Sequence, residues 1–313
     1  MSKSILVAAL AVLLTGAQWV PAWSAAKDPD QCRVVRLPDG EWTDLQARNG
    51  VYAVVLKALG YQVESKTLAA VIALEALKTG DADAWAANWM PSMKSQIDPY
   101  LAEKGFSVAK TILDGAGYGV VVPQYVADAG VKDFKDLARH KAEFEDKIYG
   151  LEPGNDSGVI LLKALADPKF GLAGWELVET SEMGMLAQAQ RLMNGGKWVA
   201  FVGWNPHPVM AKMKLHYLTG LEDTGFGVAR VDLLTRNGYI EQCPNVGKLF
   251  MNSSFTVEMN SEIMTPLAEG GNAESVARDW LIAHPDAVSP WLTGVTTFDG
   301  GDAVAAVKAV LKP

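Results

Sequence analysis

The stretch GDADAWAANWMPSM, residues 80–93, contains a predicted buried strand with turn residues at both ends. Small and apolar residues run through DADAWAANW (81–89), Gly80 precedes them and Pro91 follows them, as at the borders of a strand. The preceding AAVIALEALKTG (69–80) has the apolar spacing of a helix, and Gly80 stands where a C-terminal cap belongs. A helix that leads into a buried strand is part of a βαβ unit, which indicates an α/β protein.

The same alternation continues on both sides of this stretch. We predict further strands at CRVVRL (32–37), YQVESKTL (61–68), GYGVVVP (117–123), DKIYGLEP (146–153), WELVETS (175–181) and WVAFVGW (198–204). Helical spacing fills 45–60, 133–145, 158–167 and 183–196. The last third has one irregular strand, 226–236, and helices at 244–252, 260–271, 273–285 and 303–312. This order predicts an α/β fold with two mainly parallel sheets flanked by helices.

The length of the chain predicts two lobes, since a domain usually contains ~100 to 200 residues. A chain that leaves the first lobe, builds the second and returns would account for the order of elements. We therefore expect lobe 1 at 27–114 plus 215–313 and lobe 2 at 115–214. The two crossings, near 114–117 and 214–220, would form a hinge between the lobes.

The first residues have the three parts of a secretory signal peptide. Lys3 is followed by the apolar run from Ile5 to Leu14, and small residues then lead to Ala26. We predict a signal peptide at 1–26, although cleavage after Ser24 would also fit. No later stretch approaches ~20 uninterrupted apolar residues, and no cysteine stands at the cleavage point. The expected product is a periplasmic protein without a lipid anchor.

Charge and cysteine content narrow the partners and the compartment. The formal charge of -8 argues against nucleic acid and anionic membranes, because both attract basic surfaces. Cys32 and Cys243 are the two cysteines, and in an oxidising compartment they predict one disulfide bond. This bond would join the two sequence-distant pieces of lobe 1.

Large or polar side chains stand at the predicted strand ends, where open α/β sheets bind ligands. Three of four such ends carry tryptophan and the fourth carries a polar cluster: Trp42 with Asp44; Trp89; Glu152 with Asn155 and Asp156; and Trp204 with His207. One tryptophan alone would be core, as we expect for Trp85 at an alternating strand position. Three at one topological position predict a cage of π faces for a cation without hydrogen-bond donors, with ~0.5 to 2 kcal/mol from each ring.

The polar candidates also have simpler interpretations. Thr43 and Gln46 fit a capping box, so Asp44 is either an acid in the first turn of a helix or a ligand contact. Asn155 or Asp156 could be the N-cap of the following helix. His207, between two prolines, is expected to brace the Trp204 loop. The histidines show no metal-ligand spacing, and we expect no metal and no cofactor.

Several segments resemble the periplasmic choline and glycine betaine binding proteins of ABC importers, especially the choline-binding branch. They are GDADAWAANWMPSM, YGLEPGNDSG (149–158), SEMGMLAQAQ (181–190), FVGWNPHPVM (201–210), EQCPNVGKLF (241–250) and PWLTGVTTFDG (290–300). The segment 221–239 departs from that branch, in which it is richer in glycine. The resemblance implies a bilobal type II periplasmic-binding-protein fold that closes on its ligand like a hinge.

The resemblance also implies which residues bind the ligand. The aromatic box would consist of Trp42, Trp89, Tyr118 and Trp204, and Asp44 and Asn155 would be polar contacts. Tyr118 enters on the resemblance alone. Glu152, Asp156 and His207 are expected behind these contacts.

A carboxylate at Asp44 favours a cation with a hydroxyl, so we rank choline first and glycine betaine second. Trimethylamine N-oxide, carnitine and dimethylsulfoniopropionate follow. We expect a monomer that delivers its ligand to an ABC permease of the inner membrane. The rival is an exported enzyme on the same bilobal fold, which would need a nucleophile beside a base. The sequence indicates no such pair, and we predict no catalysis.

Overall fold

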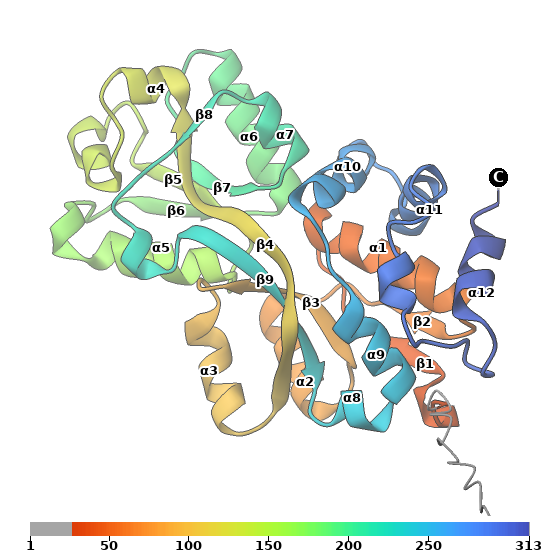
Figure 1. Ribbon diagram of the computed structural model, residues 1–313. Coiled ribbons are helices and arrows are strands. Elements are labelled where there is room, and N and C mark those ends of the chain that lie inside the picture. The colour runs from red at the N-terminus through yellow and green to blue at the C-terminus, as the bar shows by residue number, and fades with distance from the viewer. Residues whose placement is uncertain (1–26, 313) are drawn as a thin grey trace, which may run out of the picture.

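The computed structural model of the protein describes residues 27–312, so the predicted signal peptide at 1–26 lies outside the described residues. Figure 1 shows two lobes joined by long strands. The strands are β1 (Val34–Arg36), β2 (Gln62–Glu64), β3 (Ala84–Met90), β4 (Phe106–Pro123), β5 (Lys147–Gly150), β6 (Glu176–Glu179), β7 (Phe201–Asn205), β8 (Leu215–Tyr217) and β9 (Gly227–Arg236).

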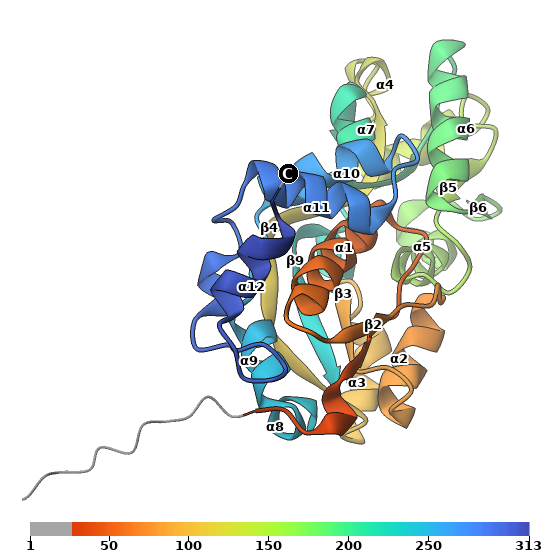
Figure 2. The ribbon, with the colours of Figure 1, turned by 90° about the vertical axis from the view of Figure 1, so that its right-hand side faces the viewer.

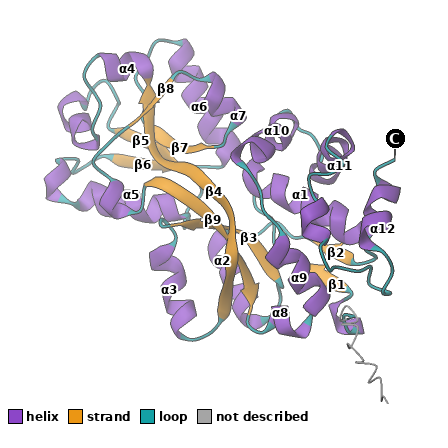
Figure 3. Cartoon of the chain, in the orientation of Figure 1, coloured by secondary structure: helices purple, strands orange, loops and turns teal. Residues whose placement is uncertain are grey.

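Helices cover both lobes, as Figure 3 shows. Lobe 1, at the lower right of Figure 1, contains α1 (Thr43–Ala58), α2 (Ala70–Thr79), α3 (Lys94–Ala102), α8 (Tyr239–Gln242), α9 (Pro244–Asn252), α10 (Val257–Leu267), α11 (Ala273–Ala283) and α12 (Ala303–Val310). Lobe 2 contains α4 (Gln124–Asp128), α5 (Asp156–Ala166), α6 (Glu182–Asn194) and α7 (Pro208–Lys212). Short 3-10 helices are η1 (Asp30–Cys32), η2 (Phe134–His140), η3 (Pro168–Phe170), η4 (Glu222–Thr224) and η5 (Ser289–Leu292).

One sheet runs through both lobes. Its order is β3-β9-β4-β7-β5-β6, and β8 pairs with β4 beside this path. The first part of β4 pairs with β9 in lobe 1, and residues 117–121 pair with β7 in lobe 2. β1 and β2 form a separate parallel pair. The long strand β4 therefore connects the lobes, as Figure 1 shows in yellow.

The two-lobed α/β fold is confirmed, but the expected mainly parallel pairing is wrong for the long strands. β5 is parallel to β6 and β7, whereas β9 is antiparallel to both β3 and β4, and β4 is antiparallel to β7. A buried strand reads as a continuous apolar run whichever way its neighbour points, so the pattern did not reveal the direction. The first half of β4, residues 106–116, was not predicted because Lys110, Asp114 and Gly115 interrupt its apolar residues.

Helix α1 is largely buried. It lies against α10, α11 and β3 (Figure 2). Leu45, Val51 and Val55 are fully buried on it. Gly50 allows a close approach to α11, because a Cβ there would clash with the carbonyl of Ala273. The tight packing fixes the start of α1, which reaches the space between the lobes.

The predicted disulfide between Cys32 and Cys243 is present, with Cα atoms 5.7 Å apart. It joins the end of η1 to the residue that precedes α9. Asp28 strengthens the same junction, because its Oδ1 accepts from the Asn245 backbone N–H at 2.7 Å and its Oδ2 from that of Val246 at 3.0 Å. The start of the described chain is thus tied to the last third of lobe 1.

The returning segment pairs differently from the expectation. Residues 215–217 of β8 pair with 121–123 of β4, on the lobe 2 side of the expected crossing at 214–220. The chain joins the first lobe along β9, where Gly227 pairs with Tyr118 and Ala229 with Ala116. The exact limits of the two lobes remain a prediction.

Candidate functional site

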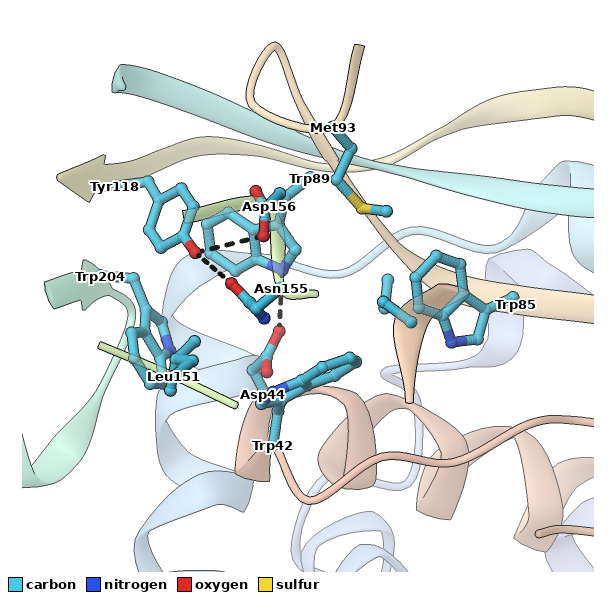
Figure 4. A pocket seen from close by; sticks show the side chains of 12 residues that line it. Trp42, Asp44, Trp85, Trp89, Met93, Tyr118, Leu151, Asn155, Asp156 and Trp204 are labelled. Carbon is cyan, nitrogen blue, oxygen red and sulfur yellow. Dashed lines mark hydrogen bonds between the residues drawn. The ribbon is translucent and has the colours of Figure 1, made fainter. Parts of the chain in front are cut away.

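A pocket lies between the lobes, and its wall contains all six residues expected to bind a ligand (Figure 4). Lobe 1 contributes the residues before and at the start of α1, part of α2 and β3 with the turn after it. Lobe 2 contributes the segment between β5 and α5 and one residue of β7, and β4 lines the space between them. The lining residues are Trp42, Asp44, Ala70, Trp85, Ala87, Trp89, Met93, Tyr118, Leu151, Asn155, Asp156 and Trp204.

The three tryptophans reach the pocket from the predicted positions. Trp42 is the residue before α1, Trp89 lies near the end of β3, and Trp204 lies near the end of β7. Trp42 and Trp204 are buried and Trp89 is half-buried. Because strand ends from both lobes meet at this gap, side chains distant in sequence form one site.

The aromatic rings meet at several angles. Trp89 and Tyr118 have ring centroids 5.6 Å apart with an interplanar angle of 44°. Trp42 and Trp85 are 6.4 Å apart at 57°. Behind the wall, Phe226 holds Tyr118 edge-on at 5.1 Å. Tilted π faces around one space are suited to a rounded cation, which meets a negative ring face on several sides.

Asp44 has a buried cation as its partner. Arg48, one helical turn further along α1, forms an ion pair with Oδ2 of Asp44, and both side chains are buried. The same Oδ2 accepts from Nε1 of Trp89 at 3.1 Å, and Nε of Arg48 donates to the Ala86 carbonyl at 2.7 Å. The negative charge of Asp44 is therefore balanced within lobe 1, which the sequence reasoning did not foresee.

The expected capping box at the start of α1 is wrong. The Thr43 hydroxyl donates to Glu182 at 2.8 Å instead of accepting from its own helix, and Gln46 donates to the Gly40 carbonyl at 3.1 Å. The helix begins at Thr43 itself, so Trp42 is the N-cap and makes no side-chain capping bond. The hydroxyl of Thr43 in lobe 1 thus donates to the carboxylate of Glu182 in lobe 2.

Asn155 caps α5 and faces the pocket at the same time. Its Oδ1 accepts from the Ser157 backbone N–H at 3.1 Å, as the N-cap interpretation predicted. The hydroxyl of Tyr118 lies 3.2 Å from the same Oδ1 and 3.3 Å from Oδ1 of Asp156. Capping and a position on the pocket wall are compatible, because the first turn of α5 points into the gap.

Asp156 stands on the pocket wall and not behind it. Burial raises the pKa of Asp156 to about 6, because a carboxylate loses its hydration there. Its Oδ2 has no hydrogen-bond partner within residues 27–312. Burial, together with the nearby charge of Asp156, also raises the pKa of Tyr118 well above its usual value. Unlike Asp44, this carboxyl group forms no ion pair with a Lys or Arg of residues 27–312.

Glu152 and His207 lie behind the wall, where they were expected. Glu152 accepts from Nε1 of Trp42 and from Nδ2 of Asn155, each at 3.2 Å. The ring of His207 meets Trp204 edge-on, with centroids 4.9 Å apart, and its Nδ1 accepts from the Met210 backbone N–H. His207 therefore braces Trp204 and caps α7.

Sequence reasoning missed several contributors. Trp85 is core, with 1% of its surface exposed, but it also lines the pocket beside Trp42 (Figure 4). Arg48 could have been found from its spacing of four residues from Asp44, which puts both on one helix face. Met93 and Leu151 carry no pattern that would distinguish them from ordinary core residues.

Two further properties of the described residues concern metal binding and membrane spanning. Within residues 27–312, no three His, Cys, Asp or Glu side chains are grouped as metal ligands would be. In the same range no helix is both long enough and apolar enough to cross a membrane. The arrangement can enclose a small cation by π faces and carboxylates.

Solved structures similar to this chain are binding proteins. An ABC-transporter choline binding protein in complex with choline is 42% identical, with a TM-score of 0.89, over 91% of this chain and 100% of that chain. A choline binding protein in an unliganded semi-closed conformation has the same identity and coverage with a TM-score of 0.82. The overall similarity is thus higher to the choline complex than to the unliganded form.

Curated sequences and family models agree. The glycine betaine/carnitine transport binding protein GbuC of Listeria monocytogenes serotype 1/2a (strain 10403S) is 26% identical over 155 residues, 50% of this chain and 52% of that protein. The family model for the substrate binding domain of ABC-type glycine betaine transport systems matches residues 33–283. This family and the similar proteins are substrate-binding proteins of transport systems, which act outside the cytoplasmic membrane. They are not enzymes, so the alternative of an exported enzyme is set aside. The chain belongs to the family of substrate-binding domains of ABC-type glycine betaine transport systems.

Proposed function

We propose that this protein captures choline between its lobes and delivers it to an ABC permease. The observation that carries the proposal is the pocket wall, in which four aromatic side chains from both lobes and from β4 surround one space. They are Trp42, Trp89, Tyr118 and Trp204. The similar choline binding protein with choline supports the same ligand.

Cation–π attraction explains why aromatic rings suit this ligand. A trimethylammonium group has no N–H, so hydrogen bonds cannot replace the water that it loses on binding. A ring face offers ~0.5 to 2 kcal/mol of attraction, with the larger value for a desolvated pair. Three or four rings therefore supply enough free energy for roughly micromolar affinity.

The charge balance of the pocket favours choline over glycine betaine. Arg48 balances Asp44, so Asp156 is the carboxyl group whose charge a bound cation would offset. Choline brings one positive charge, whereas glycine betaine brings a positive charge and a carboxylate. Arg48 and Trp89 both bind Oδ2 of Asp44, so Oδ1 is the acceptor we assign to the hydroxyl of choline.

Glycine betaine remains the second candidate because the matching family model is described by its transport. Its carboxylate would approach the backbone N–H groups in the first turn of α5, where a helix N-terminus favours negative charge. The side chain of Asn155 already caps that turn, which leaves less room for a second anion.

The remaining features belong to the same proposal. We assign a signal peptide to 1–26, a periplasmic location, a monomeric state and an inner-membrane permease as partner. Lobe 1 would comprise 27–114 plus the chain after the return crossing, and lobe 2 would start at 115. Because β8 pairs with β4, we move the proposed return from 215 to the start of β9 near Gly227.

Calorimetric titration of the mature protein against choline, glycine betaine, trimethylamine N-oxide, carnitine and dimethylsulfoniopropionate tests the proposal. We expect choline to bind most tightly, glycine betaine to bind more weakly, and every ligand to be recovered unchanged. Tighter binding of glycine betaine than of choline would overturn the choice of ligand. Binding of none of the five would overturn the function.

A further inference from the structure

The buried carboxylate of Glu182 is held entirely by donors from two different sides of the pocket. Glu182 is the first residue of α6 and has 1% of its surface exposed. Its Oε1 lies 2.8 Å from Oγ1 of Thr43 and 3.1 Å from Nε2 of His207, and its Oε2 accepts from the Thr43 backbone N–H at 3.1 Å. Glu182 is not among the residues that line the pocket.

The partners of Glu182 are neighbours of pocket residues. Thr43 begins α1 in lobe 1 and stands between Trp42 and Asp44, which both line the pocket. His207 belongs to lobe 2 and holds Trp204 edge-on. Figures 1 and 2 show α1 and α6 in different lobes. One carboxylate therefore connects the walls on both sides of the ligand space.

The hydrogen bonds around His207 assign the tautomer of its ring. Nδ1 of His207 accepts from the Met210 backbone N–H at 3.3 Å, so the proton of a neutral ring is on Nε2, which donates to Glu182. The Thr43 N–H is one of the free amides at the positive end of α1. Glu182 thus supplies from the other lobe the capping acceptor that Trp42 lacks.

We infer that Glu182 is a positioning residue that joins the two pocket walls when the lobes close and holds the closed form without touching the ligand. In an open form, water would take the place of Thr43 at the carboxylate and of the carboxylate at α1. Closure exchanges these waters for hydrogen bonds to a charged group, which are stronger than neutral ones. Because no ligand atom is involved, the effect should be equal for all ligands.

Thr43→Val tests the inference, and Thr43→Ser is the matched control. Valine has the shape of threonine but lacks the hydroxyl donor, whereas serine keeps it. We expect Thr43→Val to speed dissociation of choline and of glycine betaine by the same factor, about tenfold, with little change in association rate. The Thr43→Ser variant should release both ligands as slowly as the native protein does. Unchanged dissociation in Thr43→Val, or an effect on one ligand alone, would overturn the inference.

A double-mutant cycle isolates the pair. If the Thr43 hydroxyl acts through Glu182, Thr43→Val should change the dissociation rate much less in a Glu182→Gln background than in the native protein. As a control, Lys94 and Asp98 form an exposed ion pair, and its removal should leave the dissociation rate unchanged. Equal effects of Thr43→Val in both backgrounds would show that Glu182 is not its partner.

The inference rests on the proposed function only because the dissociation experiments use its ligands. A measurement without ligand therefore tests the inference separately from the proposed function. Spin labels at Lys163→Cys on α5 and Lys308→Cys on α12 would report the distance between the lobes. Thr43→Val should lower the closed fraction at least severalfold without any ligand. If Thr43→Val does not change the closed fraction, the positioning role of Glu182 would be overturned, whether or not choline binds. If none of the ligands binds but Thr43→Val still lowers the closed fraction, only the proposed function would be overturned.

Discussion

The two walls of the pocket differ in whether their buried aspartate has a cationic partner. On the lobe 1 wall, Asp44 has Arg48 and Trp89 as partners. On the lobe 2 wall, Asp156 has an oxygen without a partner within residues 27–312. The charge of Asp44 is balanced within its own wall, whereas Asp156 forms no ion pair with a Lys or Arg within residues 27–312. This difference supports the proposal that a bound cation offsets the charge of Asp156, while lobe 1 provides a surface whose charge is already balanced.

The largest expected effect comes from breaking the pair on the lobe 1 wall. Arg48→Met should lower the free energy of unfolding by about 3 to 5 kcal/mol, because it leaves the buried Asp44 carboxylate without its cation. Chemical denaturation measures this loss. Addition of Asp44→Asn should recover part of it.

An exposed ion pair gives the control for that experiment. Lys94→Met removes a partner of Asp98 on the surface and should change the free energy of unfolding by less than about 1 kcal/mol. If Arg48→Met were as mild as Lys94→Met, Asp44 would not depend on Arg48, and the contrast between the walls would disappear.

The aromatic rings of both walls should matter about equally. Trp89→Ala removes a π face from lobe 1 and Trp204→Ala removes one from lobe 2, and each should weaken choline binding by about 30- to 100-fold. Fluorescence or calorimetric titration measures the affinity. Trp280→Ala, on α11 and outside the pocket lining, should bind choline normally. Full affinity in either pocket variant would remove that tryptophan from the box.

The charge of the lobe 2 wall predicts a smaller, selective effect. Asp156→Asn should weaken choline by about tenfold and glycine betaine by less, because it removes a negative charge that only a net cation requires. The ratio of the two dissociation constants is the measurement. An equal loss for both ligands would mean that Asp156 contributes shape and not charge.

The smallest expected effect is a dependence on pH. The pKa of Asp156 is raised to about 6 by burial, so its charged form is disfavoured in the ligand-free closed protein. The stabilising effect of its protonation is therefore present at low pH and is lost as the pH rises through about 6. A bound cation favours the charged form, so choline affinity should increase from pH 5 to pH 7.5.

Proton counting gives a direct check of this linkage. At pH 6, choline binding should release about 0.5 proton, measured by calorimetry in buffers with different ionisation enthalpies. Asp156→Asn should abolish the release. Proton uptake on choline binding, in place of release, would contradict the assignment.

The sequence predicted the parts of the site that depend on topology. Trp42, Trp89 and Trp204 could be grouped because strand ends meet at one place in an α/β fold, and Asn155 could be recognised as a cap. The pairing direction of β4 and β9 could not be predicted, because buried strands have no alternation that records it. Thr43 fitted a local capping pattern, but its partner comes from residue 182, and no local pattern contains such a contact. The pair of Asp44 and Arg48 differs in this respect, because its spacing of four residues on one helix face is a local pattern.

The hydrogen-bonded ribbon of β4 and β9 determines how reproducibly the lobes can meet. Its pairing shifts between Leu113 and Ala116, so Asp114 and Gly115 form an irregular step at the place where β4 leaves lobe 1. A two-stranded ribbon bends across its plane more easily than it shears along its strands, because shear would break several ladder bonds at once. Closure therefore has few degrees of freedom. The lobes should follow nearly one path, and a donor and an acceptor far apart in sequence can meet in the same register at every closure.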